Sequence, residues 1–376
     1  MVAQVLLLIG TILLPQSAFS SESRSTPARL FLRGDTLRTG EQIYRAACAA
    51  CHGPDGSGNS PELIVFETPL PDFSDCQFGP REGDIDWFAV THDGGPARGF
   101  SRMMPAFGDA LTDDEIRRVI DYLRTFCDEP EWPRGELNLP RPQVTEKAFP
   151  EDEAVYTTVP SLERPFVWEH ELTYEKRFGA RNQWEVVVPF TIADREDDGW
   201  TGGLGDVAFG LKRAVYHNLD RGTIVSAAIE AIFPTGDEDD GFGSGSFAFE
   251  PFVSVGQVLP SDAFLQFQAG AKIPTDRDRA TEAGFWRGVI GGTITENRFG
   301  RIWSPMIEVL GSREFASGKS TLWDVLPQFQ VSLSTRQHVR ANLGVLVPLN
   351  ETRNRPVQLW FYLLWDTFDG PFFAGW

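Results

Sequence analysis

A pair of cysteines followed by a histidine is the part of the sequence that most clearly indicates a chemistry. Residues Cys48-Ala49-Ala50-Cys51-His52 have the C-x-x-C-H spacing of covalent c-type haem attachment. Each thiol can add to one vinyl group of a porphyrin, and the two-residue spacer lets both reach one ring while His52 lies beneath the iron. A structural or redox cysteine pair that happens to precede a histidine is the alternative. The motif predicts one covalently bound haem c, with His52 as an axial ligand of the iron.

A methionine-proline step farther along the chain could supply the second axial ligand. Thioether sulfur binds haem iron well, and combined His and Met ligation raises the reduction potential into a range used for electron transfer. Pro105 restricts Met104 to extended conformations, which suits a loop that holds a ligand against the iron. We therefore expect Met104, rather than Met103, to be the sixth ligand, and His92 is the competing candidate.

Two predicted helices bracket these residues and would position them. The stretch Thr39-Gly40-Glu41-Gln42 has the pattern of a capping box and opens a helix that leads into Cys48. A second capping box, Thr112-Asp113-Asp114-Glu115, opens a helix whose apolar residues recur at three- and four-residue spacing: Ile116, Val119, Ile120, Leu123 and Phe126. The glycine-rich loop at residues 53–58 should let the backbone pass close to the haem.

With these motifs, residues 36–127 resemble a class I monohaem cytochrome c. The resemblance places His52 as the proximal ligand, Met104-Pro105 at the position of the distal methionine, and Leu123-Arg124 within the closing helix. It implies an all-α cytochrome c domain, which we assign to residues 21–127, and a role in electron transfer.

The first twenty residues predict export. An apolar run from Val5 to Leu14 is followed by Ala18-Phe19-Ser20, as in a cleaved secretory signal peptide over residues 1–20. Cys76 and Cys127 are the two cysteines of the sequence outside the haem motif. An exported protein meets an oxidising compartment, which favours a disulfide between them over two buried free thiols.

The composition argues against several classes of function. The net charge is −19, from 53 acidic and 34 basic residues, which disfavours nucleic acid as a partner and favours cations or basic proteins. No nucleotide-binding glycine loop, zinc-ligand spacing or Ser/His/Asp arrangement stands out, so we expect neither hydrolysis nor phosphoryl transfer.

The second half of the chain has a different pattern. Residues 128–165 are rich in proline and charge, lack an apolar period, and predict a semi-rigid extended linker. From residue 166 to 376 apolar and polar residues alternate, and Phe166, Trp168, Leu172 and Tyr174 share one face of the first segment. About eleven such segments are visible, and because bacterial barrels have even strand numbers we expect about 12 antiparallel strands, or else about 10.

The alternation suits either a soluble β-sandwich or barrel with an apolar core, or a membrane barrel with an apolar outer face. Segments of about 10 residues and the aromatic ending Phe372-Phe373-Ala374-Gly375-Trp376 favour an outer-membrane barrel. The opposite face of the strands would then line the lumen with carboxylates, which would favour cations: Glu169, Glu171, Glu175, Glu185, Asp206, Glu230, Glu250, Glu308 and Asp324. The barrel also resembles the outer-membrane barrels grouped with the meta-pathway phenol-degradation transporters.

A monohaem cytochrome joined to an outer-membrane barrel resembles the fused cytochrome-porins, some of which oxidise ferrous iron outside the cell and pass electrons inward. The resemblance implies electron transfer at or across the bacterial outer membrane, with the haem domain in the periplasm or in the lumen. The expected partners are an extracellular electron donor or acceptor or a periplasmic redox protein, together with membrane lipid. The alternatives are a channel for a small solute that carries a tethered periplasmic cytochrome, and a haem enzyme such as a peroxidase, which needs an open iron site.

Overall fold

The computed structural model describes residues 38–60, 70–162, 164, 166–195 and 199–376. The predicted signal peptide over residues 1–20 lies outside these residues. Within the described part, residues 38–127 form a small helical domain, and the barrel wall follows from residue 153.

The helical domain is built around the two predicted capping boxes. Its helices are α1 (Gly40–Ala47), α2 (Ala49–His52), α3 (Asp84–Asp93), the 3-10 helix η2 (Gly95–Arg98) and α4 (Asp113–Arg124). The Thr39 hydroxyl accepts from the backbone N–H of Gln42, and Thr112 does the same for Glu115, so both helices begin where the sequence predicted. Among the described residues, none of the helices is long and apolar enough to cross a bilayer.

The core of the helical domain joins α1, α3 and α4. The apolar faces predicted from residue spacing are buried together with α3: Ile43, Tyr44, Trp87, Phe88, Ile116, Val119, Ile120 and Leu123. Each such side chain contributes about 1.5–3 kcal/mol by leaving water. This packing fixes α1, and with it the turn that carries Cys48 and His52.

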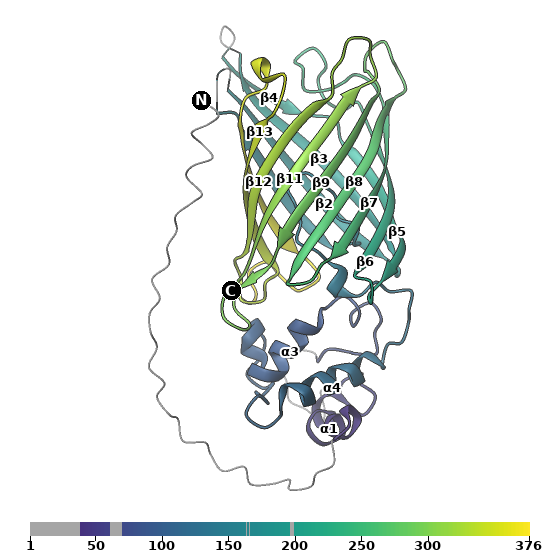
Figure 1. Ribbon diagram of the computed structural model, residues 1–376, viewed down its shortest axis with the longest axis vertical. Coiled ribbons are helices and arrows are strands. Elements are labelled where there is room, and N and C mark those ends of the chain that lie inside the picture. The colour runs from purple at the N-terminus through teal and green to yellow at the C-terminus, as the bar shows by residue number, and fades with distance from the viewer. Residues whose placement is uncertain (1–37, 61–69, 163, 165, 196–198) are drawn as a thin grey trace. The chain divides into compact units, whose positions relative to one another are not determined.

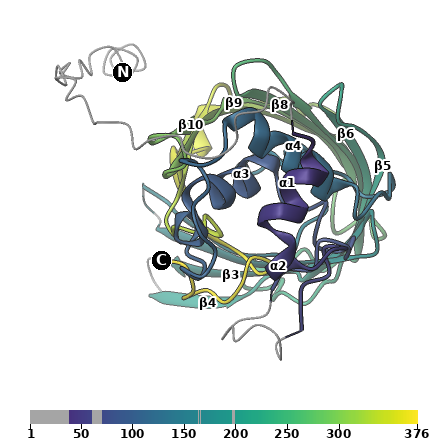
Figure 2. The same cartoon turned by 90° about the horizontal axis from the view of Figure 1, so that it is seen from below.

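The barrel wall is a closed antiparallel sheet. Within the described residues twelve long strands pair with their neighbours, and β9 pairs with β11 to close the ring (Figures 1 and 2). They are β1 (Glu153–Pro160), β2 (Val167–Phe178), β3 (Asn182–Asp194), β5 (Ala208–Asn218), β6 (Thr223–Ile232), β7 (Ala248–Val258), β8 (Ala263–Pro274), β9 (Ala283–Gly292), β11 (Ile302–Glu314), β12 (Leu322–Ser332), β13 (Val339–Pro348) and β14 (Gln358–Asp366). Shorter elements are η3 (Gly135–Leu137), β4 (Trp200–Leu204) on β3, β10 (Ile294–Thr295) on β11, and η4 (Thr352–Asn354). The predicted all-β barrel of twelve strands is confirmed.

The wall is apolar outside and polar inside. Leu172 and Phe267 are 57% and 48% exposed on the outer surface, whereas Glu175 and Gln268 are 0% and 1% exposed on the inner one. A soluble barrel would have the reverse arrangement, because its apolar side chains would fill the core. The outer face is therefore suited to lipid.

The barrel begins earlier than the sequence predicted. β1 pairs with β14 on one side and β2 on the other, although it lies within residues 128–165, which were assigned to a linker. Val155 and Val159 of β1 are buried on its inner side, and Val155 packs against Tyr362 and Leu364. The apolar-out, polar-in alternation is therefore absent from β1, which is why the pattern did not reveal it.

The aromatic C-terminal residues do not extend the last strand. β14 ends at Asp366, and the Phe372 ring folds back to 5.9 Å from the Trp365 ring. The backbone N–H of Arg336, in the turn between β12 and β13, donates to the Gly375 carbonyl at 3.0 Å. These residues pack at the mouth of the barrel beside that turn.

Residues 137–152, which we call the lumen segment, lie inside the wall. The segment contains almost no regular structure, and side chains on the inner face of the wall take up its backbone hydrogen-bonding groups. The Pro140 carbonyl accepts from Gln266 Nε2 at 2.8 Å, and the Arg141 carbonyl accepts from the Tyr362 hydroxyl at 2.6 Å. The prediction of an extended spacer is therefore wrong for these residues, because they are buried and held by the wall.

Glu308 on β11 anchors the middle of the lumen segment. Its fully buried carboxylate accepts from the backbone N–H groups of Gln143 at 2.7 Å and Thr145 at 3.1 Å, and from the Thr145 hydroxyl at 2.9 Å. Hydrogen bonds to a charged group are worth about 1.5–3 kcal/mol each. The Val144 N–H donates to the same carboxylate at 3.2 Å, so one side chain of the wall fixes three residues of the segment.

Replacing Glu308 should release the lumen segment. We expect Glu308→Ala to destabilise the protein by about 3 kcal/mol, because the N–H groups of Gln143 and Thr145 lose their acceptor. Ionic conductance in planar bilayers should rise as the segment becomes mobile. The matched control is Glu314→Ala, at the exposed end of the same strand, where Glu314 pairs with Lys319. Unchanged conductance and melting temperature in Glu308→Ala would contradict the anchoring role.

Candidate functional site

One cavity of about 1290 Å³ brings together the predicted haem residues. Cys48, Cys51, His52 and Met104 all line it. Apolar side chains from the loop before α3, from α3 and from α4 form much of the rest of its helical-domain side: Phe73, Phe78, Trp87, Val119 and Leu123. A large cavity that combines an apolar wall with charged groups is suited to a cofactor that has both an apolar ring and charged substituents.

His52 is held by the fold of the turn around it. The Tyr44 hydroxyl donates to the Gly53 carbonyl at 2.7 Å, and Asn59 Nδ2 donates to the Ala50 carbonyl at 2.7 Å. Burial lowers the pKa of His52, which favours the neutral imidazole that binds metals. Its Nδ1 atom is buried without a hydrogen-bond partner among the described residues.

Cys48 and Cys51 are both free and half-buried. Burial, with a smaller contribution from Cys51, raises the pKa of Cys48 to about 11. Cys48 therefore stays a protonated thiol. The two side chains lie at the same end of the cavity as His52, because α2 begins directly after Cys48 and ends at His52.

The loop before Pro105 brings Met104 to the cavity. Met104 is half-buried, whereas Met103 is 62% exposed. The Gly95 N–H donates to the Met104 carbonyl at 3.0 Å, and a side chain at Gly95 would overlap the Ser101 carbonyl. Glycine at this position therefore lets the Met104 loop close on itself.

His92 lies elsewhere. Its Nδ1 atom is 2.5 Å from Asp93 Oδ1, and its ring stacks on Phe88 with centroids 5.9 Å apart. Arg298, in the turn between β10 and β11, approaches Nε2 at 3.4 Å. His92 is not among the residues that line the cavity, so its surroundings do not support it as an iron ligand.

These residues fit a c-type haem. Among the described residues the buried Nδ1 of His52 has no partner, two free thiols stand at the same end of the cavity, and the thioethers of Met103 and Met104 line it too. The chemistry of this donor set, two thiols with imidazole and thioether, is that of a covalently held His/Met haem. Cys48 and Cys51 would hold the porphyrin, and His52 and Met104 would bind the iron.

Cys76 and Cys127 form a disulfide, with Cα atoms 5.4 Å apart. The bridge ties the loop before α3 to the end of α4. The loop carries Phe73 and Phe78 into the cavity, so the disulfide fixes one of its walls.

The barrel supplies part of the cavity as well. Arg98 Nη1 donates to the Phe299 carbonyl at 2.7 Å, and Arg336 Nη2 donates to the Gly99 carbonyl at 2.9 Å, so barrel turns hold the loop that leads to Met104. On the other side of the cavity, the Phe78 ring lies 6.0 Å from the ring of Phe368, which follows β14. The helical domain is therefore packed against the mouth of the barrel.

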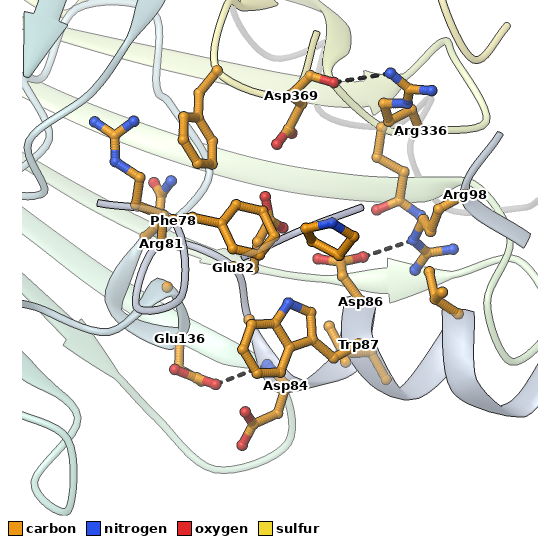
Figure 3. Close-up of a pocket in the computed structure, with 18 of the residues that line it drawn as sticks. Phe78, Arg81, Glu82, Asp84, Asp86, Trp87, Arg98, Glu136, Arg336 and Asp369 are labelled. Atoms are coloured by element: carbon orange, nitrogen blue, oxygen red, sulfur yellow. Dashed lines mark hydrogen bonds and ion pairs between the residues drawn. The ribbon is translucent and has the colours of Figure 1, made fainter. Parts of the chain in front are cut away.

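The cavity contains residues that the sequence did not single out: Glu82, Arg98, Arg336 and Asp369 (Figure 3). Arg98 follows Gly94-Gly95-Pro96 shortly before Met104, so a closer reading of that loop could have found it. Arg336 contacts Gly99 across 237 positions of sequence, and nothing local marks it.

Glu82 and Asp369 form a carboxyl pair between the helical domain and the barrel. Their side chains hydrogen-bond to each other, which requires one shared proton. Burial, with the nearby carboxylates of Asp86 and Asp366, raises the pKa of Glu82 to about 7. Burial and Glu82 raise the pKa of Asp369 well above its usual range. The pair therefore holds the helical domain to the barrel mouth through a proton.

A second group of carboxylates lies along the inner face of the barrel wall, and we call it the carboxylate row. On paired strands its members are Asp366 opposite Glu153, Glu175 opposite Glu185, and Glu230 opposite Glu250, with Gly210 between Glu185 and Glu230. A side chain at Gly210 would overlap Glu185, so glycine leaves room for that carboxylate. Because barrel strands are tilted, a row across them climbs the wall, from the end of β14 to the loop after β6 (Figure 1).

Comparison with known proteins agrees with the helical site. Residues 35–123 match the family described as cytochrome c oxidase, cbb3-type, subunit III. Cytochrome c6 of Parathermosynechococcus lividus is 31% identical over 87 residues, which are 23% of this chain and 86% of that protein. Cytochrome c6 of Gracilaria tenuistipitata var. liui is 30% identical over 87 residues, 23% of this chain and 69% of that protein.

Solved barrels align with the second half only distantly. The COG4313 outer membrane channel from Pseudomonas putida F1 is 12% identical, with a TM-score of 0.43, over 60% of this chain and 99% of that one. The KdgM porin is 9% identical, with a TM-score of 0.38, over 57% of this chain and 98% of that one. The assignment of the barrel therefore depends on its own strand pairing and inverted polarity.

The fold and the site together define a cytochrome fused to a β-barrel. The helical domain has the haem-attachment motif, the cavity and the aligned relatives of a c-type cytochrome, and the barrel wall closes around the segment that follows it. Through residues of its helical domain, the chain belongs to the cytochrome c family.

The raised pKa of Glu82 should make stability depend on pH. The folded protein keeps a proton that the unfolded chain loses near pH 4.5, so stability should fall as pH rises from about 4.5 to about 7. Glu82→Gln cannot ionise, so the fall in the free energy of unfolding over this pH range should become smaller by about 2 kcal/mol. Melting temperatures between pH 4.5 and 8 provide the measurement, and Glu41→Gln, on the exposed face of α1, is the control. An unchanged slope in Glu82→Gln would show that the pair does not share a proton.

Proposed function

We propose that this protein transfers electrons through one c-type haem at the bacterial outer membrane. Cys48 and Cys51 tether the haem, and His52 and Met104 are the axial ligands of its iron. The observation that carries the proposal is the meeting of these four residues in one cavity, although 52 positions of sequence separate His52 from Met104.

The arrangement of the chain's own groups suits an electron carrier. The haem supplies an iron that changes between two oxidation states. The protein fills both axial positions, surrounds the ring with aromatic and aliphatic side chains, and ties the cavity walls together through the Cys76–Cys127 disulfide. A carrier of this kind reorganises little on oxidation. A peroxidase needs an open iron position, and Met104 would occupy it.

The apolar outer face and polar inner face of the barrel support a location in the outer membrane. Apolar side chains cover the outer wall and polar side chains line the lumen, as in membrane barrels. In the orientation we propose, the helical domain at the barrel mouth faces the periplasm. Its acceptor there is a periplasmic redox protein.

The filled lumen supports electron transfer over solute transport. The lumen segment is held by Glu308, Gln266 and Tyr362, and it occupies the interior beside the helical domain. A free path for a small solute would require these bonds to break. Electrons need no such path.

We further propose that the electron donor is a small cationic reductant such as ferrous iron. The carboxylate row leads from the loop after β6, at the far end of the barrel, toward Glu153 and Asp366 at the end that joins the helical domain. The cation would enter only the far end of the lumen, beyond the bonds that hold the lumen segment, because carboxylates at a barrel opening concentrate cations and speed their association.

Replacing Met104 tests the haem assignment. The wild-type protein should give a haem-staining, heat-modifiable band in the outer-membrane fraction and a low-spin, six-coordinate spectrum. Met104→Ala should keep the covalent haem and lose the Met-ligated spectrum, because the sixth ligand is gone. Met103→Ala, on the exposed neighbour, is the control and should remain low-spin. A soluble protein without covalent haem would overturn the proposal.

Replacing a member of the carboxylate row tests the donor. In liposomes, ferrous iron added outside should reduce the haem, and Glu230→Gln should slow this by roughly threefold to tenfold because the field that attracts the cation weakens. Reduction by a membrane-impermeant anionic donor should not slow. Glu314→Gln, on the exposed rim, is the control. Equal rates with ferrous iron in wild type and Glu230→Gln would reject the lumen as the route of the cation.

A further inference from the structure

Two arginines line the cavity where the helical domain meets the barrel. Arg98 comes from the helical domain and Arg336 from the turn between β12 and β13 (Figure 3). Arg98 is 3% exposed, and its Nε donates to Asp86 Oδ1 at 2.7 Å. The charge of Arg98 is therefore partly neutralised.

Among the described residues Arg336 forms no ion pair with an acidic side chain, although the Asp369 carboxyl is near enough to favour its charged form. Its Nη1 donates to the Asp369 main-chain carbonyl at 3.0 Å and its Nη2 to the Gly99 carbonyl at 2.9 Å. Its Nε atom is buried and has no hydrogen-bond partner. The guanidinium lies 4.5 Å from the Phe100 ring, in the loop that leads to Met104. Arg336 is half-buried, and its unused, buried Nε donor is available to an anion in the cavity.

The chemistry of the porphyrin supplies such an anion. The vinyl groups that react with cysteine and the two propionate groups lie on opposite sides of the ring. A haem held at Cys48 and Cys51 therefore turns its propionates away from the cysteines, toward the far wall of the cavity. Carboxylates pair best with arginine, whose planar guanidinium offers several donors.

We propose that Arg336 of the barrel, together with Arg98, binds the haem propionates. The barrel then completes the haem site of the helical domain, and the haem becomes a link between the two. This inference rests on the haem binding proposed above, and adds a ligand contact from outside the cytochrome domain.

Other arginines of the cavity fit this role less well. Arg81 forms an ion pair with Asp152 and lies over the Phe368 ring, so its charge is already matched. Arg177 also has buried unpaired nitrogens, but its guanidinium lies 5.0 Å from the Trp132 ring and 5.3 Å from the Phe149 ring. Arg177 therefore faces the lumen segment, whereas Arg336 is bonded to the Met104 loop.

The test is the reduction potential of the full-length protein in detergent as a function of pH. Loss of a cation beside the propionates favours the oxidised haem, so Arg336→Gln should raise the oxidised-to-reduced ratio at a fixed potential by roughly threefold to tenfold, where tenfold is about 59 mV. The propionate that loses Arg336 should also titrate at higher pH, because a nearby cation favours its charged form. The inflection of the potential against pH should move upward accordingly. A purely structural role would leave this inflection in place.

Two variants complete the experiment. Arg336→Lys keeps the charge and should reverse at least half of the shift in potential that Arg336→Gln causes. It takes the place of Arg336→Gln if heat modifiability shows that the latter misfolds. Arg177→Gln, in the same cavity, is the control and should leave the pH profile unchanged. The proposal would be overturned if the inflection of the potential against pH moved in Arg177→Gln but not in Arg336→Gln. It would also be overturned if the inflection moved in none of the variants.

Covalent haem stain and the low-spin spectrum are recorded for every protein. Wild type without covalent haem would reject the proposed function itself. Wild type with a low-spin haem, and no effect of Arg336, would reject this inference alone.

Discussion

Buried backbone inside a closed barrel needs hydrogen-bond partners, and the structure depends on this constraint. The lumen segment has irregular backbone enclosed by the wall, so its buried N–H and C=O groups must pair with the wall or with water. Glu308, Gln266 and Tyr362 provide those partners. The polar lumen is therefore a complementary surface for one particular stretch of chain, and the two must form together.

Ion pairs also join the lumen segment to the wall. Arg141 of the lumen segment bonds to Glu175 at 2.9 Å and Glu153 at 3.3 Å, and Lys147 bonds to Glu153 at 3.0 Å. Buried carboxylates of the wall would be costly without these cations, and the cations would be costly without the wall. Only the lower part of the carboxylate row is neutralised in this way. The upper part, at Glu230 and Glu250, forms no ion pair among the described residues.

Sequence predicted those parts of the fold in which local pattern and environment agree. The cytochrome c family followed from the spacing of Cys48, Cys51 and His52, and α1 and α4 followed from their capping boxes. The sequence did not predict the lumen segment, because a stretch rich in proline and charge usually indicates a solvated linker. Here the same residues are buried, because the polar inner face of the wall can bind them. Arg336 and Asp369 carry no local signal at all, because their role arises only where the barrel mouth meets the helical domain.

The four cysteines impose an order on biogenesis. Cys76 must be oxidised to pair with Cys127, whereas the haem attachment proposed above would need Cys48 and Cys51 as reduced thiols. Both requirements fall on one short domain that meets the same oxidants. The high pKa of Cys48 disfavours its thiolate, and thiol–disulfide exchange proceeds through the thiolate. Cys48 should therefore enter a disulfide more slowly than a thiol of ordinary pKa. Within the folded domain, a thiol held protonated by burial exchanges slowly, and the other two cysteines are already paired.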